Sequence, residues 1–92
     1  MTYTLVFTQS YNKRAARWLK HHPELRNLYL KTLQLLELNP HHPSLRLHAL
    51  HGPLKGLHSV SINLSQRITL HFMIQQQSLV LVHIGHHDEV YG

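Results

Sequence analysis

The first residues of the chain alternate hydrophobic and polar side chains. Over residues 2–8, TYTLVFT, the alternation has a period of two and β-branched and aromatic residues predominate, which is typical of a half-buried strand. The side chains expected on one face of this strand are those of Tyr3, Leu5 and Phe7.

Two segments then repeat their hydrophobic residues at helical spacing. The first follows a candidate cap at Thr8 or Ser10 and extends to Lys20. The second covers residues 23–38 and starts with a proline, which suits the first turn of a helix. The expected apolar faces consist of Tyr11, Ala15, Trp18 and Leu19 in the first helix, and of Leu25, Leu28, Tyr29, Leu33 and Leu36 in the second.

The last third of the chain predicts three more strands, in residues 57–64, 67–74 and 79–85. The middle segment alternates most clearly, whereas the last is apolar on both faces, as expected of a central strand. A polar turn is expected between them at residues 75–78. The hydrophobic residues expected to face the core are Val60, Ile62, Leu64, Ile68, Leu70, Phe72 and Ile74.

These elements predict an α+β fold in which a two-helix hairpin packs on one face of a mainly antiparallel four-stranded sheet, in the order β-α-α-β-β-β. Residues 39–56 contain three prolines and two glycines, and are expected to be irregular. The other face of the sheet would carry Arg67 and His71, which are unsuited to a core. Such an open, basic face is a reasonable surface for RNA.

Composition narrows the classes of protein that fit. The 92 residues allow one domain, residues 1–92, with one core. The net charge of +5 favours polyanionic partners such as nucleic acid or an acidic protein, although a generic basic protein also fits. The absence of cysteine excludes disulfides and thiolate metal sites. Because neither a signal peptide nor a membrane-spanning run is recognisable, we expect a cytoplasmic protein without membrane contacts.

The side chains available for chemistry are mainly histidine, arginine and tyrosine. There is no cysteine, there are four acidic residues, and no glycine-rich phosphate loop is present. These residue types suffice for metal-free cleavage of RNA, in which the 2′-OH of the substrate attacks the neighbouring phosphate. That reaction needs a base for the hydroxyl, an acid for the departing 5′ oxygen and fixed positive charge for the phosphorane. No cofactor is expected.

Three short motifs follow one another in the second half of the chain. They are H-x-L-x-G at residues 48–52 with a lysine-glycine pair at 55–56, an arginine that opens a strand at Arg67, and G-x-H-x-x-x-aromatic at residues 85–91. With the β-α-α start, their order resembles the RelE/ParE toxin superfamily of type II toxin–antitoxin systems over nearly the whole chain. The resemblance is greatest to its YafQ-like and YoeB-like ribosome-dependent mRNA interferases.

The resemblance implies a role for each matched residue. His48 takes the position of the general base, Arg67 that of the arginine that stabilises the scissile phosphate, and His87 that of the terminal histidine acting as general acid or base. Tyr91 matches the terminal aromatic residue that contacts the substrate. Lys55 falls in the lysine-glycine motif, where a phosphate contact is expected.

The chain departs from the YafQ-like pattern before the arginine strand, where it has Ser61, Ser65 and Gln66 in place of a further histidine and aspartate. The matched side chains also have structural interpretations: a loop histidine can simply be solvated, and a terminal tyrosine can pack the C-terminus. A zinc site among four histidines is a competing interpretation, but their spacing matches no ligand signature, so no metal site is expected. These histidines are His41, His42, His48 and His51.

The leading hypothesis is therefore a toxin that cuts mRNA on the ribosome, leaving a 2′,3′-cyclic phosphate and a 5′-OH, and so inhibits translation. A basic stripe of Lys13, Arg17 and Lys20, together with Lys55 and His71, would contact RNA. The alternatives are a non-enzymatic ParE-like inhibitor of DNA gyrase and a decayed relic that only binds its antitoxin. All three imply a cognate antitoxin encoded by an adjacent gene, and promoter DNA bound only by the toxin–antitoxin complex.

Overall fold

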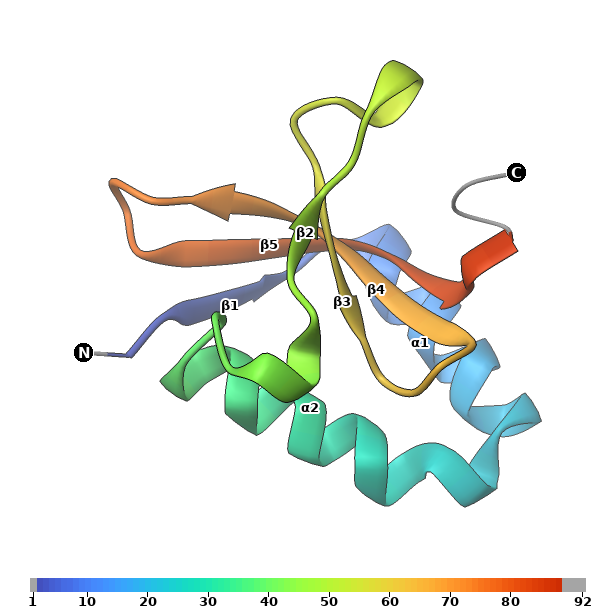
Figure 1. The fold of residues 1–92 in the computed structure, drawn as a ribbon. Helices are drawn as coiled ribbons and strands as arrows, with labels where there is room; N and C mark the ends of the chain where they lie inside the picture. Colours follow the sequence, from blue (N-terminus) through green and yellow to red (C-terminus); the bar gives the residue numbers. More distant parts are fainter. Residues whose placement is uncertain (1, 89–92) are drawn as a thin grey trace.

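The computed structural model describes residues 2–88 and has two α-helices on one face of a five-stranded sheet (Figure 1). The strands are β1 (Thr4–Phe7), β2 (His48–Ala49), β3 (His58–Ser61), β4 (Gln66–Met73) and β5 (Ser78–His86). They lie in the order β1-β5-β4-β3-β2, with β1 parallel to β5 and all other pairs antiparallel. The predicted fold class is confirmed, and the two-residue strand β2 adds a fifth strand inside the segment expected to be irregular.

The helices are α1 (Gln9–His21) and α2 (Arg26–Leu38). The hydroxyl of Thr8 caps α1 by accepting a hydrogen bond from the backbone N–H of Tyr11 at 3.1 Å. Pro23 has no N–H with which to continue α1, so the chain makes a 3₁₀ turn at Pro23–Leu25 before α2 begins. The predicted helical hairpin is confirmed. No helix in residues 2–88 has both the length and the hydrophobicity to cross a membrane.

The core lies between the helices and the sheet. Two aromatic members of the core are joined across the helical layer, because the hydroxyls of Tyr11 on α1 and Tyr29 on α2 are 3.0 Å apart and buried. The other buried hydrophobic residues of this cluster are Ala15, Trp18, Leu36, Leu45, Val60, Ile62, Ile68, Leu70, Leu79, Leu81 and Ile84. Phe72 packs against the cluster and meets the ring of Tyr3 edge-on at 5.5 Å between ring centres, so it lies on the helix side as predicted.

One irregularity in β5 sets which of its side chains face the helices. Thr69 pairs with His83, whereas the next residue, Leu70, pairs with Leu81, so Val82 is an extra residue on β5. Such a β-bulge shifts the two-residue alternation by one position. The side chains on the helix side are consequently those of Leu79, Leu81 and Ile84, and those on the open face are Val80 and His83, while Gly85 contributes only backbone there.

β5 also runs past the end of β1. The two strands pair only as far as Phe7 and Leu81, and no described strand flanks β5 on that side beyond this point. Two side chains supply the missing partners: the hydroxyl of Thr8, the cap of α1, donates to the carbonyl of Leu81 at 3.1 Å, and Nε of Arg14, within α1, donates to the carbonyl of Ile84 at 2.7 Å. These bonds attach α1 to the edge of the sheet.

Four hydrophobic residues expected on buried faces are exposed instead, among them Phe7, which is 41% exposed at the end of β1. Leu64 is 72% and Ile74 71% exposed, because β3 ends at Ser61 and β4 at Met73, which places both in turns. Leu28 is 38% exposed at the margin of α2. The stripe that α2 buries is formed by Tyr29, Thr32 and Leu36.

Candidate active site on the open face of the sheet

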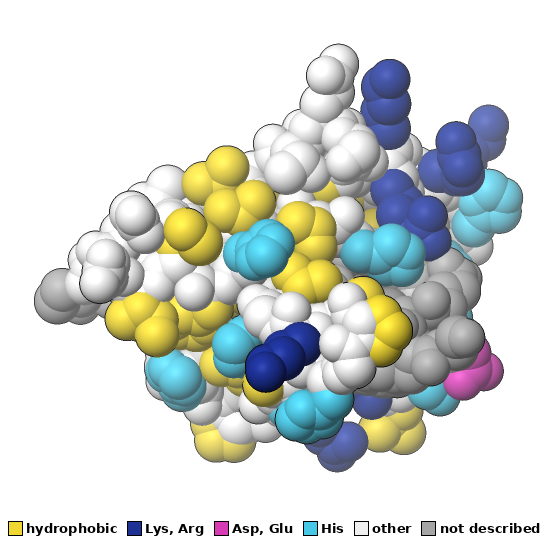
Figure 2. Space-filling view, turned by 90° about the horizontal axis from the view of Figure 1, so that it is seen from above, with side chains coloured by type: hydrophobic (Ala, Val, Ile, Leu, Met, Phe, Trp, Pro, Cys, Tyr) yellow, Lys and Arg dark blue, Asp and Glu magenta, His cyan; other side chains and the backbone are white. Residues whose placement is uncertain are grey.

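The strand register places polar side chains in two rows across the open face of the sheet. Residues paired directly on neighbouring antiparallel strands share a face, and neighbouring strands lie about 4.8 Å apart. One row, running from β2 to β5, consists of His48, Ser59, Thr69 and His83. The next row consists of Ser61, Arg67 and Gly85. Figure 2 views the molecule from the side away from α2, where histidines and basic side chains are prominent and little acidic surface is in view.

Arg67 is half-buried at the centre of the second row. Its NH1 group donates hydrogen bonds to the hydroxyl of Ser61 and to the carbonyl of Asn63, the latter at 3.1 Å. Its Nε is buried and has no hydrogen-bond partner among the described residues. A guanidinium group carries five N–H donors in a rigid fork, so an arginine fixed in this way can hold a phosphate with the donors that these two bonds leave over.

His87 lies beside the same turn that holds Arg67. The backbone N–H of His87 donates to the carbonyl of Ser65 at 2.8 Å. In the same turn, the carbonyl of Asn63 accepts the hydrogen bond from the guanidinium of Arg67. Nε2 of His87 is 3.0 Å from the carboxylate of Asp88, and the ring stacks on that of His86 at 4.5 Å between centres. The β3–β4 turn is thus bonded to the side chain of Arg67 and to the backbone of His87, two of the residues predicted to act in catalysis.

His48 lies on the same face, on the outermost strand. Its Nδ1 is 2.9 Å from the carbonyl oxygen of Arg46. Because a carbonyl oxygen can only accept, Nδ1 donates this hydrogen bond, and in the neutral imidazole the lone pair is then on Nε2, as a general base requires. The neighbouring His58 on β3 is partly buried, and this burial, followed by electrostatic repulsion from the His48 and His41 side chains, lowers its pKa.

The remaining predicted residues are divided between two layers. His71 is exposed on the open face of β4, where it pairs with Val80. Lys55 is exposed in the β2–β3 loop, which rises above the sheet in Figure 1. The stripe of Lys13, Arg17 and Lys20 is exposed on α1, in the helical layer. Tyr91 lies outside the described residues.

Two residues of this face were missed in the sequence. His83 stands in a segment expected to be apolar on both faces, and only the bulge at Val82 brings it into the row with His48. The sequence feature that could have indicated the position of His83 is that it is the one polar residue inside an otherwise apolar run. Ser61 was noted only as a departure from a family pattern, whereas its hydroxyl accepts a hydrogen bond from Arg67.

The residues 86–88 could hold a metal ion. One ligand atom each of His86, His87 and Asp88 lies within 4.8 Å of the others, and no other such group of three occurs among the described residues. Imidazole and carboxylate ligands suit zinc and related divalent ions. The four histidines weighed as a zinc site in the sequence, in residues 41–51, do not form such a group.

Comparisons with known proteins relate the whole fold to toxins. No protein-family model and no curated protein sequence matches the chain. Among solved structures, YafQ from E. coli is 16% identical with a TM-score of 0.79 and coverage of 98% of this chain and 99% of that one. The E. coli DinJ–YafQ toxin–antitoxin complex matches at 19% identity, with a TM-score of 0.78 and full coverage of both chains, 100% each.

Two further structures come from other bacteria. A metal-bound toxin from Helicobacter pylori is 24% identical, with a TM-score of 0.76 and coverage of 98% and 99% of the two chains. A YoeB/ParE toxin from Agrobacterium tumefaciens is 18% identical, with a TM-score of 0.74 and coverage of 91% of this chain and 98% of that one. The chain has the fold of the RelE/ParE toxins.

Proposed function

We propose that the chain is the toxin of a type II toxin–antitoxin system and acts as a ribosome-dependent endoribonuclease that cleaves mRNA. The observation that carries the proposal is Arg67, fixed by Ser61 and Asn63 on the open face, with the backbone of His87 bound to the same turn. The shared fold with YafQ and other toxins supports it.

The cleavage step uses three side chains. Nε2 of His48 takes the proton of the 2′-OH, and the 2′ oxygen forms a bond to phosphorus while the bond from phosphorus to the 5′ oxygen breaks. His87 gives a proton to the departing 5′ oxygen, and Arg67 stabilises the charge of the phosphorane. The products are a 2′,3′-cyclic phosphate and a 5′-OH.

The separation of His48 and Arg67 on the sheet leaves room for one phosphate group between them. His48 and Arg67 are two strands apart and in neighbouring rows, a Cα separation of roughly 12 Å from ordinary strand spacing. Both side chains are long enough to approach a phosphate from opposite sides. His83, in the row of His48 but on β5, is a second candidate for the base.

The surroundings of the site supply contacts for RNA. His71 extends the open face, and Lys55 lies in the loop above it. The stripe on α1 adds three positive charges, from Lys13, Arg17 and Lys20, in the other layer. A ribosome that holds the mRNA in place would provide the orientation that a shallow, exposed site cannot provide by itself. Tyr91 is proposed as the aromatic contact to the substrate.

We infer further that a cognate antitoxin, encoded by an adjacent gene, binds this chain. The E. coli toxin of the same fold has been crystallised with its antitoxin. A flexible acidic or amphipathic segment that folds on binding would complement the net charge of +5. Promoter DNA is expected to bind the toxin–antitoxin complex only.

Primer extension on mRNA from cells that express the chain tests the proposal. The wild-type chain should arrest growth and produce cuts at translated positions. His87→Gln should lower the cleavage rate by about 10²–10⁴-fold, the usual contribution of a proton-transfer group. The matched control is His51→Gln, an exposed histidine in the β2–β3 loop whose side chain makes no capping hydrogen bond, and it should cleave like the wild type.

Substitutions of Arg67 distinguish a role in binding the phosphate from a purely structural role of this side chain. Arg67→Lys keeps the charge but not the fork of donors, and we expect it to lose cleavage as Arg67→Ala does. Arg26→Ala, which removes an exposed arginine from the start of α2, is the control. Growth arrest with intact mRNA and damaged or relaxed DNA would contradict the nuclease and identify an inhibitor of gyrase.

A further inference from the structure

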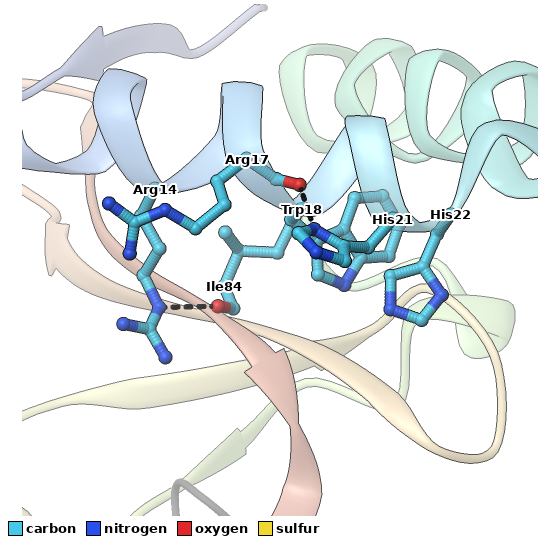
Figure 3. Close-up of a pocket in the computed structure, with 6 residues that line it drawn as sticks. All are labelled: Arg14, Arg17, Trp18, His21, His22 and Ile84. Carbon is cyan, nitrogen blue, oxygen red and sulfur yellow. Dashed lines mark hydrogen bonds between the residues drawn. The ribbon is translucent and has the colours of Figure 1, made fainter.

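A pocket of about 240 Å³ lies between α1 and the end of β5, on the helix side of the sheet (Figure 3). Its lining consists of Arg14, Arg17, Trp18, His21, His22 and Ile84. The first four follow one another at positions i, i+3, i+4 and i+7 of α1 and therefore share one face of the helix. Ile84 directly precedes Gly85, the partner of Arg67, so the pocket and the candidate active site lie at the same end of the sheet on opposite faces.

The lining is cationic. The guanidinium of Arg14 is held by the bond from its Nε to the carbonyl of Ile84, and Arg17 is exposed at the rim. Figure 3 shows both guanidinium groups on one side of the pocket and the rings of His21 and His22 on the other. No acidic residue of the described chain lines it. Two guanidinium forks on one side of a pocket suit an anionic group with several oxygens.

The anion is expected at the arginine end of the pocket. The histidine end coincides with the C-terminus of α1, where the helix carries partial negative charge. The carboxylate of Glu24 also lies 3.7 Å from Nδ1 of His22. The helix end and the Glu24 carboxylate both disfavour a negatively charged group of the ligand at the histidine end. An uncharged part of the ligand is therefore expected there.

The aromatic wall indicates what that uncharged part is. Trp18 is only 7% exposed and its indole N–H donates to Gln66 at 2.8 Å, so the ring is held rigidly at the base of the pocket. The ring of His22 lies over it, 5.0 Å between centres and tilted by 33°. Flat rings beside arginines are the surface on which unpaired bases and their sugars rest next to a phosphate. A carboxylate of an acidic peptide would use only the arginines.

We propose that this pocket binds one nucleotide of a single-stranded RNA, with its phosphodiester at Arg14 and Arg17 and its base or ribose against His22 and Trp18. The pocket is a binding site on the opposite face from the residues of cleavage, and its occupation does not depend on whether the chain cleaves RNA.

Titration with 2′-O-methylated hexauridylate tests this, because the probe has no free 2′-OH and stays intact. Trp18 is the only tryptophan of the chain, so its fluorescence reports on the pocket. We expect a saturable change in the full-length chain. Arg17→Ala should raise the dissociation constant roughly tenfold, as the loss of one charge-assisted hydrogen bond does, and should lower the salt slope by about 0.7.

The matched control is Lys31→Ala, which removes one exposed positive charge from α2 outside the pocket. It should leave the dissociation constant within about twofold, because it changes only the distant field of the protein. Equal weakening by both substitutions, or the lack of any saturable response, would overturn the proposal. Tighter binding of hexaglutamate than of the oligonucleotide, with the same dependence on Arg17, would also overturn it and assign the pocket to an acidic peptide.

Cleavage of mRNA by the wild-type chain, measured alongside, keeps the two proposals apart. Cuts in mRNA without a saturable fluorescence response to the oligonucleotide would overturn the proposal of a nucleotide-binding pocket, but not the proposal of a nuclease. Binding that depends on Arg17, without cuts in mRNA, would support the pocket and contradict the nuclease.

Discussion

The hydrogen bond between Trp18 and Gln66 joins α1 to β4 in the buried part of the molecule. The indole N–H donates to the side-chain carbonyl of Gln66 at 2.8 Å, and the two residues are only 7% and 8% exposed. Gln66→Met keeps a side chain of similar size but removes the acceptor, so the indole N–H stays buried without its partner. We expect this change to lower the free energy of unfolding by about 1–3 kcal/mol, the cost of one desolvated, unpaired donor.

A double-mutant cycle separates the hydrogen bond from packing. Trp18→Phe leaves a gap as well as an unpaired Gln66, so its own cost does not measure the bond. In the double variant both polar groups are absent, and its loss of stability should be smaller than the sum of the single losses by about 1 kcal/mol. Urea unfolding followed by far-UV circular dichroism measures all four chains, including those without tryptophan.

The control for this cycle is Gln34→Met, an exposed glutamine on α2, which should change stability by less than about 0.5 kcal/mol. Single losses that add within about 0.5 kcal/mol in the double variant would show that the bond contributes nothing, and would refute the reasoning.

Two further predictions concern the core and the pH dependence of stability. Tyr11→Phe leaves the buried hydroxyl of Tyr29 without the partner that lies 3.0 Å away; it should cost about 1–3 kcal/mol, or about 4–8 °C of Tm for each kcal/mol, and an unchanged melting curve would contradict it. Burial, then His48 and His41, lowers the pKa of His58, so the folded state resists its protonation. Stability should be full above about pH 6.5 and fall as the pH drops through the folded pKa. His58→Gln should make the loss of stability at low pH smaller, and a loss as steep as in the wild type would contradict this prediction.

The regular elements could be predicted because their hydrophobic period matches their geometry. Residues 68–72 alternate cleanly, and Ile68 and Leu70 are buried against the helices as expected. The spacing of Tyr11, Ala15 and Trp18 likewise gave the buried face of α1. These features depend on neighbours along the chain, which a sequence displays directly.

The candidate site was predictable only in part, because it depends on register between strands. The bulge at Val82 arises from how β5 pairs with β4, and it alone decides that His83 lies on the open face. The hydrogen bond from Arg67 to Ser61 crosses from β4 to β3. The strand β2 was hidden because its two residues stand among prolines and glycines. None of these has a local pattern.

The overhang of β5 beyond β1 also bears on self-association. A strand edge with free backbone groups is a template on which another chain can add a strand. Here Thr8 and Arg14 occupy the carbonyls of Leu81 and Ile84, so an incoming strand would have to displace both side chains before pairing with residues 82–86. The start of the chain through α1 therefore protects the free edge of β5, the longest described strand, from pairing with a strand of a second molecule.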